Sequence, residues 1–293
     1  MPLSYREGGV RGRIKSNSMG KHLSRVMVAL AFFLASTSVA LAEETIRFFD
    51  VHATLAKDRT ATIEERITYD FGEGTRHGIF RLMPNVYDRN GGAYTLRLNI
   101  KDVQMDGASI PYVVQTQNRD LEIKIGDPTR LVTGVHTYLI QYTTERSLND
   151  FSDHVEWYWN VTGNGWSIPI ERASLELVAP SSTQRDCFIG FFGSRDADCA
   201  WQDTAAFVQV SSTRALSDGE GMTVVFGFPR EAFVDVPFWQ RFVWFVQDNG
   251  WVGLPIIIFF LMWFIWYRYG KEPRGRGTIV PQYEEPRALP PAL

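Results

Sequence analysis

The sequence predicts an all-β fold, an antiparallel β-sandwich of about ten short strands, followed by one transmembrane α-helix. Across residues 43–234, apolar and polar residues alternate with a period of two, and turn-forming pairs such as Asp106-Gly107 separate the alternating segments. No segment in this range has the length and apolar stripe of a helix. Further along, residues 251–267 carry no charge. Two packed sub-sandwiches are an alternative to a single sandwich.

The first 42 residues have the composition of a secretory signal peptide. A basic segment precedes the apolar run VMVALAFFLA at 26–35, and Ala40 and Ala42 form an A-x-A pattern before Glu43. We predict cleavage after Ala42, with a retained signal anchor as the alternative that the short apolar run disfavours. The long basic segment also suggests a start at Met19, in which case residues 1–18 are a misassigned extension.

The exported part, residues 43–234, contains the predicted strands. Clear alternation occurs at 94–100, 121–125 and 173–177, where every second residue is apolar. Further strands are predicted at 46–55, 61–71, 135–143, 154–161, 207–211 and 222–228. With 45% hydrophobic residues among 293, the chain can build one large domain or two small ones.

Residues 235–250 include VPFWQRFVWFVQD, in which two polar pairs lie seven residues apart. On a helix, Gln240-Arg241 and Gln247-Asp248 share one side, and aromatic residues cover the rest. We predict an interfacial helix lying on the outer leaflet of a membrane. A helix that packs against the domain is the alternative.

Residues 251–267, which begin at Trp251 and end at Tyr267, read WVGLPIIIFFLMWFIWY. As a helix this run is about 26 Å long, enough to cross the bilayer core, and aromatic residues stand at both ends. A buried core helix is the alternative. We predict a transmembrane helix at 251–269, with the lipid bilayer as its partner.

The residues after the span are basic, and the positive-inside rule therefore places the C-terminus in the cytoplasm. The chain is predicted to be a single-pass protein of the bacterial cytoplasmic membrane, with residues 43–250 outside. The Pro-rich segment 270–293 is predicted to be an extended docking segment or linker.

The two cysteines of the chain, Cys187 and Cys199, both fall in the exported part. An even pair in an oxidising compartment predicts a disulfide, with free thiols as the alternative. A metal site is not expected from two cysteines with no histidine nearby.

Several motifs occur in a characteristic order: ATIEERITYDF at 61–71, TRHGIFRLMP at 75–84, WNVTGNGWSIPI at 159–170, the Trp-rich span, and GTIVPQYEEP at 277–286. In this order the chain resembles the bacterial predicted membrane proteins grouped as domain of unknown function 2207. The resemblance implies a membrane-tethered, extracytoplasmic β-rich domain with no assigned activity. Members often continue into a cytoplasmic part with more spans, so a chain ending at Leu293 is expected to be a short member or a truncated frame.

The sequence contains no catalytic signature of the kinds G-x-S-x-G, G-x-x-x-x-G-K-[ST] or H-E-x-x-H, and it predicts no cofactor. A net charge of -3 without a basic, aromatic-interleaved stripe excludes nucleic acid as a partner on charge grounds. Arg76, His77 and Arg81 are candidates for holding an anionic group. The alternative is that the arginines pair with acids of the preceding strand, namely Glu64, Glu65 and Asp70.

The segment DFSDHVE, with Asp150, Asp153, His154 and Glu156, offers oxygen and nitrogen ligands for calcium or zinc, or an acid–base pair. The EF-hand pattern is absent, and on an extended strand these side chains point to different faces. A solvated loop is therefore the preferred interpretation.

The stretch WYWNVTGNGWSIPI at 157–170 holds three tryptophans and no charge. The period of two sends Trp157 and Trp159 into the sandwich, and leaves Tyr158 and Asn160 on the face that could meet a ligand. Gly163-Asn164-Gly165 is predicted to turn a hairpin, with residues 166–170 returning as an edge strand.

Together these features favour a non-enzymatic, membrane-anchored module that binds an envelope protein or polymer. The candidate contact residues are Arg76, His77, Arg81, Tyr158 and Asn160. An alternative is a carbohydrate-binding domain or an envelope hydrolase that uses His77, Asp153 and Glu156. The hydrolase requires these three side chains to converge in one pocket.

Overall fold

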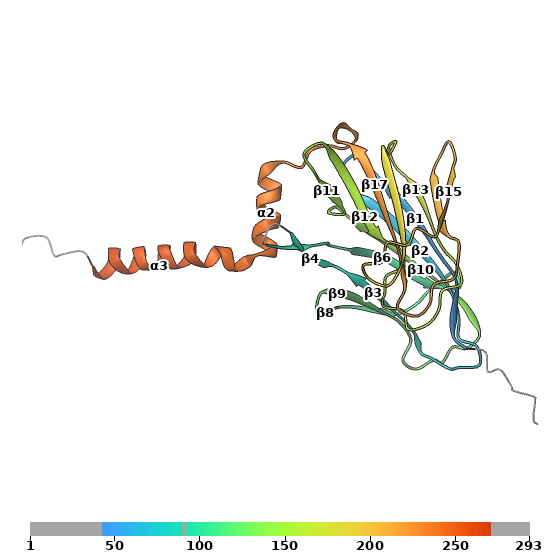
Figure 1. The fold of residues 1–293 in the computed structure, drawn as a ribbon. Coiled ribbons are helices and arrows are strands. Elements are labelled where there is room, and N and C mark those ends of the chain that lie inside the picture. The colour runs from blue at the N-terminus through green and yellow to red at the C-terminus, as the bar shows by residue number, and fades with distance from the viewer. Residues whose placement is uncertain (1–42, 90–91, 271–293) are drawn as a thin grey trace, which may run out of the picture.

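The computed structural model describes residues 43–89 and 92–270, which form a β-rich domain with two helices at its C-terminal end (Figure 1). The predicted signal peptide at 1–42 and nearly all of the predicted tail, 271–293, lie outside the described residues.

An eight-stranded sheet forms one layer of the domain, with the strand order β15-β16-β13-β1-β2-β10-β6-β7. All neighbours are antiparallel except β1 and β13, which pair in parallel. The strands of this sheet are β1 (Thr45–Leu55), β2 (Ala61–Asp70), β6 (Asn99–Met105), β7 (Ala108–Ser109), β10 (Val135–Thr144), β13 (Ala173–Val178), β15 (Cys199–Asp203) and β16 (Val208–Ser212).

Three smaller sheets accompany the large one. A four-stranded sheet has the order β11-β12-β17-β14, a three-stranded sheet has the order β3-β9-β8, and β4 pairs with β5 as a separate hairpin. Their strands are β3 (Gly78–Pro84), β4 (Val86–Arg89), β5 (Gly92–Thr95), β8 (Tyr112–Gln117), β9 (Asp120–Gly126), β11 (Leu148–Asp150), β12 (His154–Asn160), β14 (Gln184–Gly190) and β17 (Gly221–Pro229).

The core lies between the large sheet and the smaller sheets. On β2, Ile63 and Ile67 are fully buried while Glu64 and Arg66 between them face solvent, as the alternation predicts. Aromatic contacts join the layers: the ring centroids of Tyr142 on β10 and Trp159 on β12 are 6.4 Å apart. The all-β sandwich with one apolar C-terminal helix is therefore confirmed.

The strands outnumber the ten or so that alternation indicates. β8 was not predicted because all of its residues are exposed, so neither of its faces carries an apolar stripe. The predicted strand at 94–100 is divided between β5 and β6, with residues 96–98 outside both.

The disulfide between Cys187 and Cys199 is present. Cys187 lies on β14 of the four-stranded sheet and Cys199 on β15 of the eight-stranded sheet, so the bond joins two layers of the sandwich. The loop between the cysteines carries Phe191 and Phe192 on the surface.

The predicted hairpin at Gly163-Asn164-Gly165 is wrong. The neighbours of β12 are β11 and β17, and no strand returns beside it from this turn. Instead the chain crosses towards the large sheet, where Ile170 forms isolated bridges with Ile46 and Leu216. Gly163 serves a different purpose, since it lets the loop pass close to the buried side chain of Arg81.

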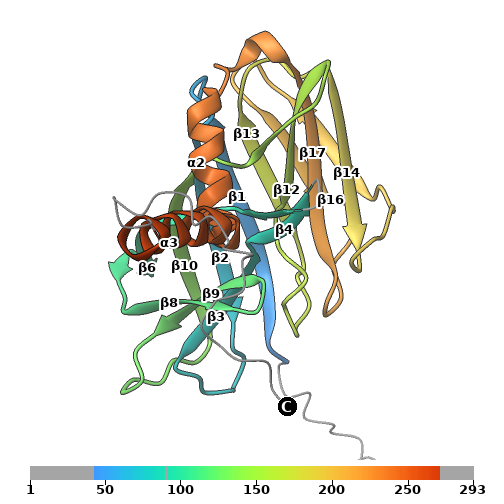
Figure 2. The same ribbon diagram turned by 90° about the vertical axis from the view of Figure 1, so that its left-hand side faces the viewer.

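A short 3-10 helix η1 (Arg230–Ala232) follows the last strand, and then come α2 (Phe238–Asp248), the 3-10 turn η2 (Gly250–Gly253) and α3 (Leu254–Tyr269). Together η2 and α3 form the one helix in the described part of the chain that is long and apolar enough to cross a membrane, at Gly250–Tyr269. It projects away from the β-domain (Figures 1 and 2), and none of its side chains is buried.

Helix α2 combines features of both interpretations that the sequence allowed. Its C-terminal end is fastened to the domain by Asp248, which accepts a 2.6 Å hydrogen bond from Arg146. Most of its aromatic side chains are nevertheless exposed: Phe238, Trp239, Phe242 and Phe245. Its position in the membrane interface stays a prediction.

Candidate functional site

The structure places Arg81 in the interior, where it cannot contact a ligand as the sequence interpretation proposed. Its side chain on β3 is 2% exposed and forms two hydrogen bonds with Glu65 on β2, at 2.7 and 2.8 Å. The alternative interpretation, pairing with an acid of the preceding strand, is the one observed. Burial by itself lowers the pKa of Arg81, but the charge and hydrogen bonds of Glu65 raise it above its ordinary value.

The remaining N–H groups of Arg81 bind backbone carbonyls. Nη1 donates to Leu82 and Thr162, and Nη2 donates to Val161 as well as to Glu65. With Nε on Glu65, all five donors are used. The hydroxyl of Tyr142 donates to the same carboxylate at 2.7 Å.

This cluster explains the first glycine of the Gly-Asn-Gly turn in WNVTGNGWSIPI. Gly163 has a φ of +77°, and a Cβ there would lie 2.8 Å from Nη1 of Arg81. The indole of Trp166 donates to the Thr162 carbonyl at 2.9 Å and is itself buried. Three of the motifs in the chain, on β2, β3 and the loop after β12, therefore meet at one buried ion pair.

Arg76 and His77 lie in the turn before β3 and have partners within the fold. Arg76 pairs with Glu44 at 2.6 Å, which is not one of the acids that the sequence suggested. The Nδ1 atom of His77 lies 2.9 Å from the carbonyl oxygen of Arg130. Arg76 and His77 therefore lie near each other at the surface, whereas Arg81 lies in the interior and does not join them.

The three residues of the hydrolase hypothesis do not converge in the cavity that His77 lines. That cavity is formed with Asp106, Asp127 and Arg130, and neither Asp153 nor Glu156 lines it. The Oδ1 atom of Asp153 lies 2.8 Å from Nδ1 of His154 at the start of β12. No group of three His, Cys, Asp or Glu side chains capable of holding a metal ion occurs among the described residues.

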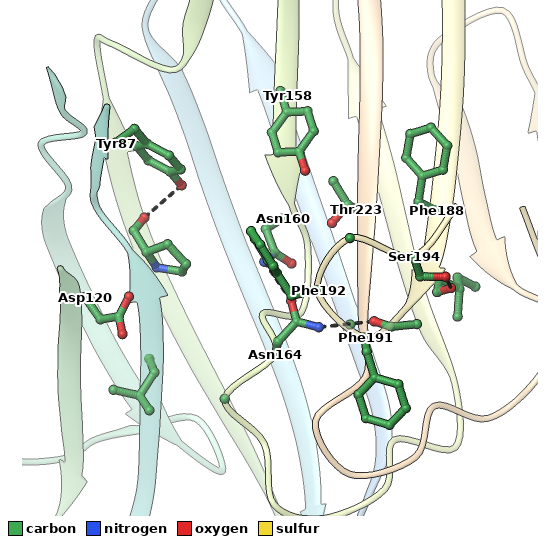
Figure 3. A pocket seen from close by; sticks show the side chains of 17 residues that line it. Tyr87, Asp120, Tyr158, Asn160, Asn164, Phe188, Phe191, Phe192, Ser194 and Thr223 are labelled. Carbon is green, nitrogen blue, oxygen red and sulfur yellow. Dashed lines mark hydrogen bonds between the residues drawn. The ribbon is translucent and has the colours of Figure 1, made fainter. Parts of the chain in front are cut away.

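Tyr158 and Asn160, in contrast, line a groove of about 340 Å³ on the outer face of the four-stranded sheet. Trp157 and Trp159 point into the core, as predicted, and leave the alternate residues of β12 on this face. Figure 3 shows Tyr87 and Asp120 on one side of the groove and Tyr158, Thr223 and Phe188 on the strands of the sheet.

The disulfide loop forms another side of the groove, through Phe191 and Phe192. These rings are 63% and 95% exposed, which is unusual for phenylalanine in a folded domain. Sequence reasoning missed them, although two adjacent phenylalanines in a short closed loop cannot both point inward.

An amide network fixes the polar part of the groove. Asn164 donates to the carbonyl oxygens of Gly190 and Gly219, and its own oxygen accepts a 3.3 Å hydrogen bond from Asn160. Asn160 also accepts from the backbone N–H of Gly163 at 3.0 Å. The positions of both amides are therefore set by the fold before any ligand arrives.

Tyr87 lies at the other side of the groove and donates to the carbonyl oxygen of Pro84 at 3.0 Å. Burial raises its pKa to about 12, and Tyr158 and Asp120 add to the effect. The hydroxyl of Tyr87 is therefore protonated and neutral at physiological pH. Asp120 has the sole carboxylate among the described residues that line the groove.

Comparison with solved structures yields weak likenesses. An M1 zinc metallopeptidase from Deinococcus radiodurans is 9% identical, with a TM-score of 0.36 over 62% of this chain and 42% of that chain. The native leukotriene A4 hydrolase from Saccharomyces cerevisiae is 9% identical, with a TM-score of 0.38 over 68% and 33%. These likenesses carry no argument about activity.

Sequence comparison is more informative. The uncharacterized protein YciQ of Escherichia coli (strain K12) is 29% identical over 158 residues, which are 53% of this chain. The match spans only 25% of the length of that relative. The family model described as the N-terminal domain of a predicted membrane protein (DUF2207) matches residues 45–228, more than half of the chain. The motifs that meet around Arg81 all lie within this range, and the chain belongs to the DUF2207 family.

Proposed function

We propose that this protein is a non-enzymatic binding module anchored in the bacterial cytoplasmic membrane, whose β-domain holds a segment of an envelope polysaccharide in the groove. The β-domain is on the outer side of the membrane in this proposal and the C-terminus is in the cytoplasm. The apolar helix Gly250–Tyr269 and the membership of a membrane-protein family support the anchoring.

The observation that carries the proposal is the composition of the groove. Tyr158, Phe191 and Phe192 offer flat apolar rings, while Asn160 and Thr223 offer hydrogen-bonding groups between them. A sugar ring has an apolar face of C–H groups and a rim of hydroxyls, so it matches both kinds of surface. A volume of about 340 Å³ accommodates one or two such rings.

The ionisable groups support binding rather than hydrolysis. Cleavage of a glycosidic bond ordinarily uses two carboxyl groups on either side of the bond. Among the described residues that line the groove, only Asp120 has a carboxylate. Binding alone needs no second acid.

Helix α2 supports a fixed position of the domain near the bilayer. The exposed rings of Phe238, Trp239, Phe242 and Phe245 form an apolar surface of the kind that enters the headgroup region. The same helix is fastened to the domain through Asp248. In this arrangement the groove faces the envelope at a set distance from the membrane.

Binding can be tested with the full chain in nanodiscs and purified envelope polysaccharide. Tyr158→Ala and Phe192→Ala are expected to weaken binding by about two- to tenfold each, because an aromatic contact contributes about 0.5–1.5 kcal/mol. Tyr112→Ala is the matched control, since Tyr112 is a tyrosine exposed on β8 that does not line the groove. The measurement is isothermal titration calorimetry.

Equal affinity of the parent and Tyr158→Ala would contradict the proposal. Capture of a protein that persists after the polysaccharide has been digested enzymatically would also contradict it, in favour of a protein partner.

A further inference from the structure

A second cavity, of about 430 Å³, lies beside the groove and next to helix α2. Tyr87 and Tyr158 line both spaces, so the two are neighbours along the same face of the domain. Unlike the groove, the second cavity is lined by an arginine, Arg146, together with Ser147, the ring of Trp159 and one carboxylate, that of Asp150.

Arg146 is buried, yet part of its hydrogen-bonding capacity is unused. Its side chain is 6% exposed and its guanidinium carbon contacts two aromatic rings, 4.6 Å from the centroid of Tyr94 and 5.0 Å from that of Trp244. Nη2 donates to Asp248, but Nε and Nη1 have no partner. The hydroxyl of Ser147, which is also buried, has none either.

A buried donor without an acceptor is unfavourable, because it has lost its hydrogen bonds to water without replacement. Here three such groups belong to adjacent residues that line one cavity. The three atoms are themselves covered, so an acceptor in the cavity would satisfy them together after a small shift of these side chains.

The charges around the cavity favour a negatively charged acceptor. Asp248 contacts Arg97 at 3.5 Å as well as Arg146, and Asp150 contacts Arg59 at 2.7 Å and Arg241 at 4.0 Å. These four arginines thus face two carboxylates among the described side chains. This group of side chains therefore carries a net positive charge. Arg146, whose Nε and Nη1 have no acceptor, is one of its members.

Both carboxylates are ionised at neutral pH. Burial by itself raises the pKa of Asp248 and of Asp150, but hydrogen bonds and charge from Arg146 and Arg59 bring both below the ordinary value. They are thus already neutralised by their own partners.

We propose that this cavity is a binding site for an anionic group, a carboxylate or a phosphate, held by Nε and Nη1 of Arg146 and by the hydroxyl of Ser147. The group has two possible sources. It belongs either to the polymer in the adjoining groove, a source that rests on the proposed function, or to the headgroup of a bilayer lipid beside α2.

The test uses inorganic phosphate as the probe and the full chain in phosphatidylcholine nanodiscs. Saturable binding is expected by calorimetry, together with a rise in the midpoint of thermal unfolding, because a ligand of the folded state stabilises it. Arg146→Lys is expected to abolish this binding, and Ser147→Ala to weaken it by about tenfold, since one hydrogen bond to a charged group is lost.

Two controls separate the site from its surroundings. Arg66→Gln removes an exposed arginine of β2 that pairs with Glu64 and does not line the cavity, and it should leave phosphate affinity within about twofold. Phe192→Ala affects only the groove and should also retain phosphate binding. Loss of polysaccharide binding with intact phosphate binding would therefore contradict the proposed function but not the anion site.

The source of the anion is identified by competition. Lower phosphate affinity in nanodiscs that contain phosphatidylglycerol indicates a lipid headgroup, and lower affinity in the presence of an acidic polysaccharide indicates the polymer. No saturable phosphate binding to the parent, or equal binding to the parent and Ser147→Ala, would overturn the anion site.

Discussion

Arg81 and Arg146 are both buried and both paired with a carboxylate, but they differ in how completely their donors are used. Arg81 has an acceptor for every N–H group, from Glu65 and three backbone carbonyls. Arg146 bonds Asp248 through Nη2 and leaves Nε and Nη1 unpaired. Arg81 lies between sheets, whereas Arg146 lines a cavity next to α2.

The difference teaches that burial of a charge does not by itself distinguish structure from function. A saturated arginine holds three segments of the chain together and has nothing left to offer a ligand. An unsaturated arginine on a cavity wall retains donors that only a further molecule can satisfy. Substitutions at the two sites should therefore have different consequences.

The largest effect is expected for Arg81→Met. It leaves Glu65 buried without its charge partner, and the free energy of unfolding should fall by about 3–5 kcal/mol. The double variant Arg81→Met/Glu65→Leu should recover part of this loss, because no unpaired charge remains. The measurement is chemical denaturation of the full chain in detergent micelles.

Arg146→Met is the matching variant at the other site. It should lower the free energy of unfolding by less than Arg81→Met, because Asp248 retains its contact with Arg97. If Arg146→Met were as destabilising as Arg81→Met, the distinction between the two arginines would fail.

A smaller effect is expected for Gly163→Ala. The new methyl group would meet Nη1 of Arg81 and require the unfavourable φ of +77°, so stability should fall by about 2–3 kcal/mol. Gly134→Ala is the matched control, with a φ of +75° and no atom within 4 Å of the added Cβ. It should cost about 1 kcal/mol from backbone conformation alone. If thermal denaturation showed the same loss of stability for Gly163→Ala and Gly134→Ala, the side chain of Arg81 would be able to move away from the new methyl group without cost.

The smallest effect concerns acidification and the attachment of α2. The folded-state pKa of Asp248 lies below its unfolded value, so its contribution to stability is complete above about pH 3.9 and declines as the pH falls through the folded-state pKa. Spin labels at the exposed positions Val243 and Ala205 should report a broader distance distribution only when the pH is below about 3.9. Asp248→Asn should remove this pH dependence. Broadening near pH 6 in the parent would point to another titrating group.

Much of the fold follows from local pattern. Residues such as Ile63, Ile67, Trp157 and Trp159 face inward because a strand that is half buried must alternate. The disulfide and the apolar helix were also predictable, since each rests on a signal within one short segment. Strand β8 carries no such signal, because both of its faces meet solvent.

The candidate site was less predictable, because it depends on contacts between distant segments. The donors of Arg81 that Glu65 leaves over bind the carbonyls of Val161 and Thr162, about 80 residues further along the chain. The groove likewise combines Tyr87 with Phe192. No spacing rule links such positions. Tyr158 and Asn160 were identified because they lie on one strand, where alternation applies.

The parallel pairing of β1 with β13 has a consequence for how the chain acquires its structure. β1 lies in the middle of the large sheet, and one of its two neighbours begins at Ala173. During synthesis from the N-terminus, one edge of β1 must wait unpaired until residue 178 has emerged, while local contacts with β2 can already form. An open apolar edge of this length is a place where aggregation competes with folding, and where a chaperone would be most useful.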